Sequence, residues 1–462
     1  MTIQELNTKA MQCSGSYNIK NFWVFKDDLF ALSNKELLNF PYCLVAKYCC
    51  LLMAGDIDSA EEILKLFPEN SLLLFGCEIV NPNITWKRFI HIMQYLVKND
   101  MFIPYVQLSV GRPSLMNGFN DFTRIWPLFP KYKNVFLNSI GHIYGTDNAE
   151  NLYDLMIAES YYQKNNLIEA EKLVTKSLKD FDNNKDSRFL FIAYHLEYKI
   201  LLFSGEIFNS KGYIKQMKAF LKKYNTAEYE INLQAVEMWA SLHDNDYEKV
   251  FDWYHNCSPD ENGNFNMIDT YRYLIKLRCY LLNGEHVALL SLVEKLRPLL
   301  SRGRRYMDLC EIDLLLAMSL YEQKKFNEAF DTFERSLKIA KRHKYYRLIG
   351  DEGDRAAHLI IDYMKKRGES KFLKDVYEIA RKAAVLSPLY LRNEIKKQCN
   401  FTEEETDILR LVEQGKDRDE IAELFFISEN TVKYHLKKIY SKLGVDSACK
   451  AVWKAKLYGI IK

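Results

Sequence analysis

One short stretch near the C-terminus gathers side chains that can neutralise phosphates and hydrogen-bond to base edges. The polar positions of "ISENTVKYHLKKIYSKLGV", residues 427–445, include Thr431, Lys433, Tyr434, Lys437, Lys438 and Lys442. Ammonium groups neutralise the phosphates of duplex DNA, and ammonium and hydroxyl groups also donate to bases in its major groove. An ordinary solvent-exposed helix face often has the same composition. Whether this stretch binds DNA must therefore be judged from the elements around it.

A regular apolar stripe predicts how this stretch is held. Val432, Leu436, Ile439 and Leu443 follow one another at the spacings of a single helix face. Ser428 stands directly before them, where a serine side chain accepts a hydrogen bond from the first helical turn. We therefore predict a helix over residues 429–443 that buries the stripe and turns its basic side outward.

Two earlier segments carry the spacing of helix starts. Thr402 with Glu405 forms a T-x-x-E capping box, and the helix that it opens stops at Gly415. Asp417 with Glu420 forms a second capping box (D-x-x-E) for a short helix, which a tight turn at Phe426–Ile427 separates from the basic helix. Two helices joined in this way form a helix-turn-helix, whose second helix has the diameter to enter the major groove.

The charge of the chain supports a nucleic-acid surface only locally. The whole sequence has a net charge of +3, which by itself argues for no polyanionic partner. Residues 401–429, however, contain 3 basic and 10 acidic residues, whereas residues 430–462 contain 8 lysines and one acid. This asymmetry suits a basic face laid on phosphates, with the acidic helices turned away.

Residues 401–462 resemble the C-terminal DNA-binding domain of LuxR-type transcriptional regulators. The shared elements are the first capping box, "EIA" at 420–422, "IS..TVK.H" at 427–435, "KLGV" at 442–445, "AV" at 451–452 and the closing "GII". The resemblance implies that Lys433, Tyr434 and Lys437 lie nearest base edges. It places Thr431, Lys438 and the turn residues near phosphates. Further expected DNA contacts are Arg418, Ser428 and Lys442.

The resemblance also implies a homodimer on DNA that reads a two-part site. The pairing surface is then expected on the last helix, at Ala451, Val452 and Ala455. The chain departs from the family pattern at Glu404 and Ala448, where arginine is usual, and at 417–419, where Ser-Asn-Lys is usual. Because residues 417 and 419 are acidic, Arg418 is the side chain of this turn that is expected to donate a hydrogen bond to a DNA phosphate.

Upstream, small residues recur at fixed spacings through pairs of helical segments. Spacings of 12 and then 7 residues run through Ala317, Ala329 and Ser336, and again through Ala158, Ala170 and Ser177. The pattern recurs more weakly at 42–67, 235–254 and 274–296. A small residue lets two antiparallel helices approach closely, and these stretches resemble tetratricopeptide-type hairpins. We predict an all-α chain in which a tetratricopeptide-like solenoid precedes the helix-turn-helix; an irregular helical bundle is the alternative.

Residues 23–385 resemble the helical sensor region of MalT-type activators, which carry a LuxR-type domain at their C-terminus. Those activators begin with an ATP-binding domain, but the sequence contains no G-x-x-x-x-G-K-[ST], so we expect neither such a domain nor a cofactor. Asp27 and Asp28 are followed by no strand–helix alternation, so we expect no phosphorylated receiver domain.

We expect three parts along the chain. Residues 1–386 form the sensor or interaction region, 387–400 a linker that follows the helix break at Pro388, and 401–462 the helix-turn-helix domain. Residues 105–147, rich in Pro and Gly, break the first part. They are either a connection between two halves of the solenoid or a loop that overhangs a groove.

Other classes of protein find little support. Ten cysteines without a CxxC pair, no export signal and no apolar run of 18 residues predict a reduced, soluble, cytoplasmic bacterial protein. The histidines form no metal-binding or catalytic pattern, and His435 is expected to be buried or part of a capping network, so we predict no enzyme.

Two functions remain open. In the first, the chain binds double-stranded DNA, senses a small molecule or a protein or peptide on its solenoid, and has RNA polymerase as a further partner. In the second, it is a protein-interaction scaffold with a vestigial DNA-binding domain.

Overall fold

The computed structural model describes residues 1–14, 20–101, 112–118, 120–144, 146–184, 187–224, 229–244, 246–263, 265–386, 401–457 and 460–461. Their regular elements are all helices, with one isolated bridge between Asn117 and Asp121, so the predicted all-α class is confirmed. The chain divides into two compact units, Met1–Ala383 and Ala384–Lys462. No helix in the described ranges has the length and apolar character needed to cross a membrane.

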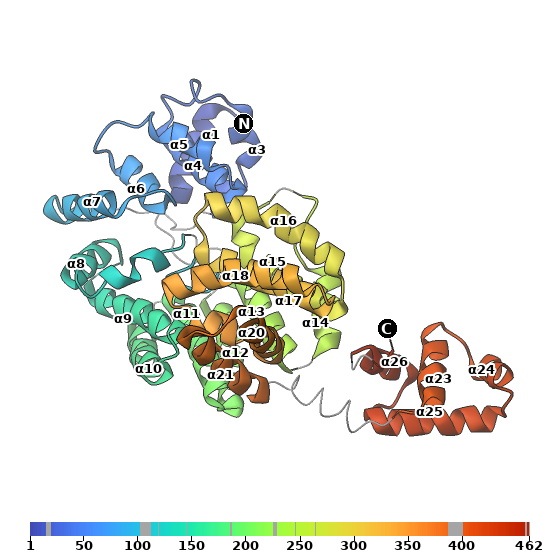
Figure 1. Cartoon of the computed structure of the whole chain (residues 1–462). Coiled ribbons are helices and arrows are strands. Elements are labelled where there is room, and N and C mark those ends of the chain that lie inside the picture. The colour runs from blue at the N-terminus through green and yellow to red at the C-terminus, as the bar shows by residue number, and fades with distance from the viewer. Residues whose placement is uncertain are drawn as a thin grey trace. The chain divides into compact units, whose positions relative to one another are not determined.

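The first unit contains three groups of helices (Figure 1). The N-terminal group is α1 (Ile3–Ser14), α2 (Lys20–Trp23), α3 (Lys26–Ala31), α4 (Pro41–Ala54), α5 (Ile57–Leu64), α6 (Leu72–Val80) and α7 (Trp86–Lys98). The second group consists of the short helix η1 (Thr123–Leu128) and α8 (Lys133–Tyr144).

The third group, which we call the solenoid (residues 146–367), supplies most of the core of this unit. It comprises α9 (Thr146–Gln163), α10 (Leu167–Asn184), α11 (Ser187–Ser204), α12 (Ile207–Tyr224), α13 (Glu230–Asp244), α14 (Tyr247–Asn256), η3 (Met267–Asp269), α15 (Thr270–Asn283), α16 (His286–Arg302), α17 (Tyr306–Glu322), α18 (Phe326–His343), α19 (Tyr346–Gly350) and α20 (Gly353–Arg367). Helix α21 (Lys371–Leu386) packs after it.

The predicted hairpins of the solenoid are present. Each of the six small residues of the two strong repeats is fully buried, as close helix packing requires. The third small residue also makes the same hydrogen bond in both repeats. The Ser336 hydroxyl donates to the Cys310 carbonyl at 2.8 Å, and the Ser177 hydroxyl donates to the Asn151 carbonyl at 3.2 Å, each 26 residues earlier.

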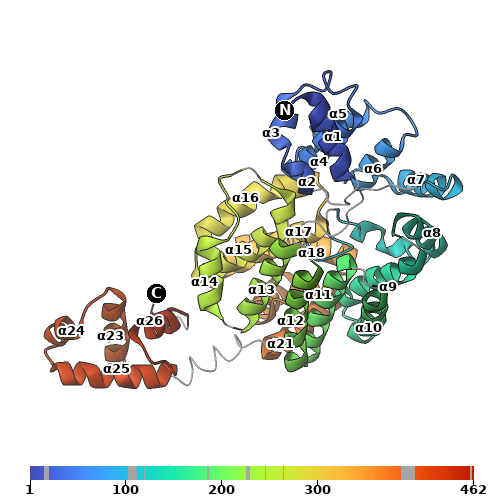
Figure 2. The same cartoon turned by 180° about the vertical axis from the view of Figure 1, so that it is seen from behind.

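The three weaker repeats also form hairpins, namely α4 with α5, α13 with α14 and α15 with α16. A further hairpin, α11 with α12, was not recognised from the sequence, because its small-residue spacing is irregular. Figures 1 and 2 show α9 to α12 lying side by side as successive antiparallel helices, and neighbouring pairs are in contact.

The N-terminal group packs directly against the solenoid. Met267 and Ile268 of η3 belong to the core of the N-terminal group. Gly55 ends α4 in the left-handed conformation, with φ of 78°. A methyl group on Gly55 would come within 2.8 Å of the end of the Leu299 side chain in α16, which can shift, so the positive φ is what favours glycine here.

The described part of residues 105–147 is more than a bare connection. It contains η1 and α8, and residues 112–118 fold into the solenoid with Ser114, Leu115 and Asn117 buried. We call residues 112–123 the inner segment. Residues 102–111, 119 and 145 lie outside the described residues, as does the predicted linker 387–400.

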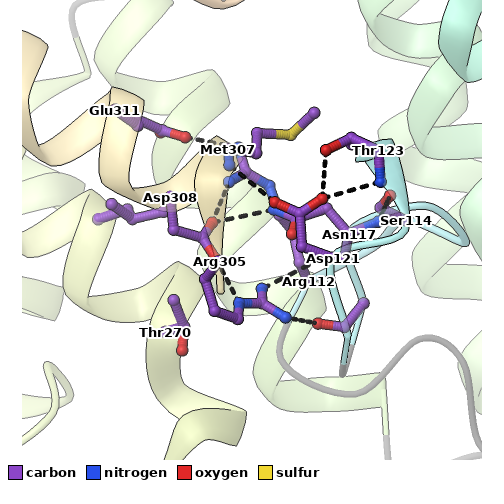
Figure 3. Close-up of polar contacts among 12 residues, drawn as sticks. Arg112, Ser114, Asn117, Asp121, Thr123, Thr270, Arg305, Met307, Asp308 and Glu311 are labelled. Carbon is purple, nitrogen blue, oxygen red and sulfur yellow. Dashed lines mark hydrogen bonds and ion pairs between the residues drawn. The ribbon is translucent and has the colours of Figure 1, made fainter. Parts of the chain in front are cut away.

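Buried charges fasten the inner segment to α17 (Figure 3). Asp308, whose side chain has no exposed area, accepts from Arg112 at 2.8 Å, from Asn117 at 3.0 Å and from Arg305 at 2.6 Å. The Arg305 guanidinium also donates to the Gly118 carbonyl at 2.7 Å. One buried carboxylate thus accepts from three donors, and two of them, Arg112 and Asn117, lie about 190 residues earlier in the sequence.

A second buried carboxylate completes the attachment. Asp121 accepts from the Met307 backbone N–H at 2.8 Å and from the Thr123 backbone N–H at 2.9 Å. The Thr123 hydroxyl also donates to Asp121 and accepts a hydrogen bond from Tyr345. The inner segment is therefore held by specific polar contacts along its whole described length.

Candidate nucleic-acid interface

The structure describes four helices of the second unit between residues 401 and 461, the part that we call the reader. They are α23 (Glu403–Glu413), α24 (Arg418–Phe425), α25 (Glu429–Leu443) and α26 (Ala448–Leu457). Both predicted capping boxes are formed. The Glu405 N–H donates to the Thr402 hydroxyl at 3.2 Å, and the Glu420 N–H donates to the Asp417 carboxylate at 2.9 Å.

The predicted basic helix has the bounds expected from the sequence. Ser428 caps α25 by accepting a hydrogen bond from the Thr431 N–H at 3.2 Å. The four residues of the apolar stripe are at most 5% exposed and pack in one core with Ile408, Leu409 and Ile421 of the two preceding helices. The local signals therefore predicted both the extent and the orientation of this helix.

The turn between α24 and α25 rests on an unusual residue. Phe426 has φ of 55°, in the left-handed region, and its side chain is 96% exposed. The Ile427 N–H donates to the Ala422 carbonyl at 3.0 Å, which closes the end of α24. The turn lies at Phe426–Ile427, as the sequence predicted, but a phenylalanine in this conformation is strained relative to glycine, which no sequence signal indicated.

Four of the predicted DNA contacts lie on the open side of α25. Lys433, Tyr434, Lys437 and Lys438 are exposed, and the Tyr434 side chain is 63% exposed. Ser428 is exposed and half-buried Thr431 shares a 2.8 Å hydrogen bond with its hydroxyl, so these two sit together at the start of the helix.

Arg418 is exposed at the first turn of α24. The structure therefore leaves this arginine, like the open side of α25, accessible to a partner.

Lys442 has an internal partner that the sequence interpretation did not foresee. Its ammonium lies 2.5 Å from Glu405 of α23, and that of Lys438 lies 3.4 Å from the same carboxylate. Glu405 is 1% exposed. Although burial opposes it, the hydrogen bond from Lys442 lowers the pKa of Glu405, so the carboxylate stays ionised. Lys442 thus braces α25 against α23, and its contact with phosphate remains a prediction.

The three residues predicted to pair two copies differ in their surroundings. Ala451 and Ala455 are fully buried in the core of the reader, where their small side chains let α26 pack closely. Val452 is half-buried beside them. The two alanines therefore serve folding within one copy, and of the three only Val452 has side-chain surface to offer a second copy.

His435 occupies a structural position. Its Nε2 atom lies 3.7 Å from Glu404, and its side chain is 16% exposed. In the described ranges, no group of three or more His, Cys, Asp or Glu residues is arranged to hold a metal ion.

Comparison with known proteins identifies both parts of the chain. A family model described as a MalT-like TPR region matches residues 150–366, and the model of bacterial regulatory proteins of the luxR family matches residues 399–455. The response regulator protein VraR of Staphylococcus aureus strain Mu3 is 32% identical over 160 residues, which are 32% of this chain and 77% of VraR.

A second relative shares a shorter region. The HTH-type transcriptional regulator AlkS of Alcanivorax borkumensis is 33% identical over 102 residues, which are 22% of this chain and only 11% of AlkS. The similarity to AlkS is therefore confined to a small part of that protein.

Proposed function

Because the chain belongs to the luxR family of bacterial regulatory proteins and carries a MalT-like TPR region, we propose that it is a sequence-specific regulator of transcription that acts on double-stranded DNA in the cytoplasm. The observation that carries the proposal is the open side of α25. It presents lysines and a tyrosine on a capped helix, and that helix is held by the short helix and tight turn before it.

The charges on α25 support this role. Lys433 and Lys437 are exposed, and no carboxylate lies within ion-pair distance of either one in the described part of the chain. Unpaired ammonium groups on a groove-sized helix gain the most from phosphates and base edges, because no internal ion pair has to be broken. We assign Lys433, Tyr434 and Lys437 to base edges, and Arg418, Ser428, Thr431 and Lys438 to phosphates.

We further propose that two copies pair on DNA, because one helix-turn-helix covers only a half-site. The exposed side of α26 around Val452 is the proposed contact. The solenoid is the proposed sensor, since it is a large helical body whose interior, together with the inner segment, contains a network of buried ion pairs and hydrogen bonds.

Selection of binding sites from a pool of random duplexes by the full chain tests this function. We expect enrichment of a site with two related halves, and we expect Val452→Glu to weaken binding to the paired site more than to a single half. A folded chain that enriches no sequence would contradict the proposal and favour the alternative, a helical interaction scaffold with a vestigial DNA-binding domain.

A further inference from the structure

A polar cavity lies inside the solenoid, beside the start of the inner segment. Its volume is about 70 Å³, and its lining comes from the inner segment and from α9, α11, α13, α15, α17 and the end of α19. By the same measure one water needs about 10–15 Å³, so the cavity has room for roughly five waters or one small molecule. Its wall combines aromatic rings with charged groups, unlike the apolar core around it.

His195 presents an unmatched acceptor to this cavity. The residue is 9% exposed, and its Nδ1 atom lies 3.2 Å from the Pro113 carbonyl of the inner segment. A carbonyl oxygen can only accept, so Nδ1 carries the proton and Nε2 is a bare acceptor. Nε2 has no hydrogen-bond partner among the described residues, and burial lowers the pKa of His195 to about 3, which keeps the ring neutral.

Lys199 lies one helical turn further along α11 and brings an excess of positive charge. Its ammonium lies 3.2 Å from Asp351, but the same carboxylate also holds Arg347 at 2.7 Å and accepts from the Tyr162 hydroxyl at 2.6 Å. Two cations therefore share one carboxylate. The ammonium also lies 5.2 Å from the ring centre of Trp239 in the cavity wall, and burial lowers the pKa of Lys199.

The remaining ionised groups around the cavity balance one another. Three arginines meet three carboxylates in a chain of ion pairs, namely Arg305 with Asp308, Arg112 with Asp308 and Glu311, and Arg278 with Glu311 and Glu352. Glu159 also lines the cavity, where burial raises its pKa to about 7, and it accepts from Leu115 and Ser114. Among the cations that line the cavity, Lys199 is therefore the one that shares its carboxylate, Asp351, with Arg347.

We propose that this cavity is the effector site of the solenoid and that it binds a small hydroxylated monocarboxylate. The carboxylate pairs with Lys199, and a neighbouring hydroxyl donates to His195 Nε2. Side chains four residues apart on one helix face are about 5–6 Å apart at their Cβ atoms, which suits two adjacent groups of one small molecule. A second hydroxyl reaches Gln163, whose buried Oε1 atom also has no partner in the described part of the chain.

The site also touches the inner segment. His195 contacts the inner segment at Pro113, and Arg112 of that segment lines the cavity. A ligand at His195 and Lys199 thus contacts α11 and the inner segment together and stabilises their packing. The site deepens the sensor role proposed above and rests on it.

Calorimetric titration of the full chain with three probes of similar size tests the proposal. Glycerate has the carboxylate and both hydroxyls, propanoate lacks the hydroxyls, and glycerol lacks the carboxylate. We expect glycerate to bind at least about tenfold more tightly than either of the other two, because each of them leaves a buried polar group unmatched. Equal binding of the three probes, or no binding of glycerate, would overturn the proposal.

Variants assign the binding to the cavity. Lys199→Met removes the ammonium, and His195→Asn keeps a donor toward Pro113 while removing the Nε2 acceptor; each is expected to weaken glycerate binding by about tenfold or more. Lys176→Met is the matched control, because Lys176 also pairs with one aspartate, at 2.8 Å from Asp154, but lies outside the cavity. Unchanged glycerate binding in a folded Lys199→Met variant would contradict the assignment.

Duplex binding by the same preparations separates this proposal from the proposed function. A chain that binds DNA but discriminates none of the three probes refutes the effector site and leaves the DNA-binding role intact. A chain that binds glycerate but no duplex refutes the DNA-binding role and leaves the ligand site intact.

Discussion

The reader and the solenoid place their basic residues in opposite surroundings. On α25, Lys433 and Lys437 stand exposed, while the apolar stripe beneath them forms the core. In the solenoid, Asp308 holds Arg305 and, from the inner segment packed against it, Arg112. A surface charge costs little to maintain and is available to a partner, whereas a buried charge requires a counter-charge and fixes the elements that it joins. The first arrangement suits binding to DNA, and the second suits a defined internal structure.

The largest loss of stability is expected from Asp308→Ala, which tests the role of the buried charges. The change leaves Arg112, Arg305 and Asn117 without their shared acceptor, and loss of one partner of a buried ion pair costs about 3–5 kcal/mol. Denaturation of the full chain by urea, followed by circular dichroism, should show this loss in the transition of the first unit.

Asp331→Ala is the matched control for that measurement. Asp331 pairs with Arg367 at 2.8 Å, but both side chains are exposed, so the expected cost is at most about 1 kcal/mol. Equal losses of unfolding free energy from the two substitutions would show that the buried network stabilises the chain no more than an exposed ion pair does.

An intermediate effect is expected from Glu405→Gln in the reader, where one carboxylate is buried as in the solenoid. The change removes the ion pairs with Lys442 and Lys438 and should cost about 1.5–3 kcal/mol at neutral pH. Because the folded reader lowers the pKa of Glu405, the stabilisation is present above the ordinary value of 4.5 and is lost as the pH falls through the lower folded value.

Thermal unfolding of the reader transition from pH 7 to pH 3 measures this contribution. The wild-type and Glu405→Gln transitions should converge at the acid end. A constant gap between them across the whole range would exclude the ionised carboxylate as the cause.

The smallest effect is expected at the turn. Phe426→Gly should stabilise the reader by about 1 kcal/mol, because glycine adopts a positive φ without strain and a side chain that is 96% exposed loses little burial. Leu424→Gly, two residues earlier inside α24, should instead destabilise it by about 1 kcal/mol. Opposite signs in thermal unfolding support the strained turn, and destabilisation by both changes would argue against it.

The two regions also differ in how far the sequence predicts them. The caps at Thr402, Asp417 and Ser428 and the stripe on α25 depend on residues within a few positions of one another, so local rules predicted α23, α24 and α25, whereas α26 was expected from the family resemblance. The contact of Arg112 with Asp308 joins residues 196 positions apart, and no local pattern announces it.

Within the reader too, contacts between residues far apart in the sequence were not predicted. The pair between Lys442 and Glu405 spans 37 positions, so the sequence showed Lys442 only as one more lysine of the basic face. Ala451 and Ala455 were predicted from the family resemblance as pairing residues, and their burial in the core follows from how α26 packs on α23 and α25.

The most direct test of the central claim is a salt titration of duplex binding by the full chain. We predict affinity that falls steeply with salt, and about tenfold weaker binding at low salt after Lys433→Ala together with Lys437→Ala. The control is Lys416→Ala with Lys450→Ala, which removes the same charge from lysines already paired with Glu420 and Asp446, and should change little. A folded chain that binds no duplex at low salt, or a Lys433 and Lys437 variant that binds like the wild type, would contradict the account.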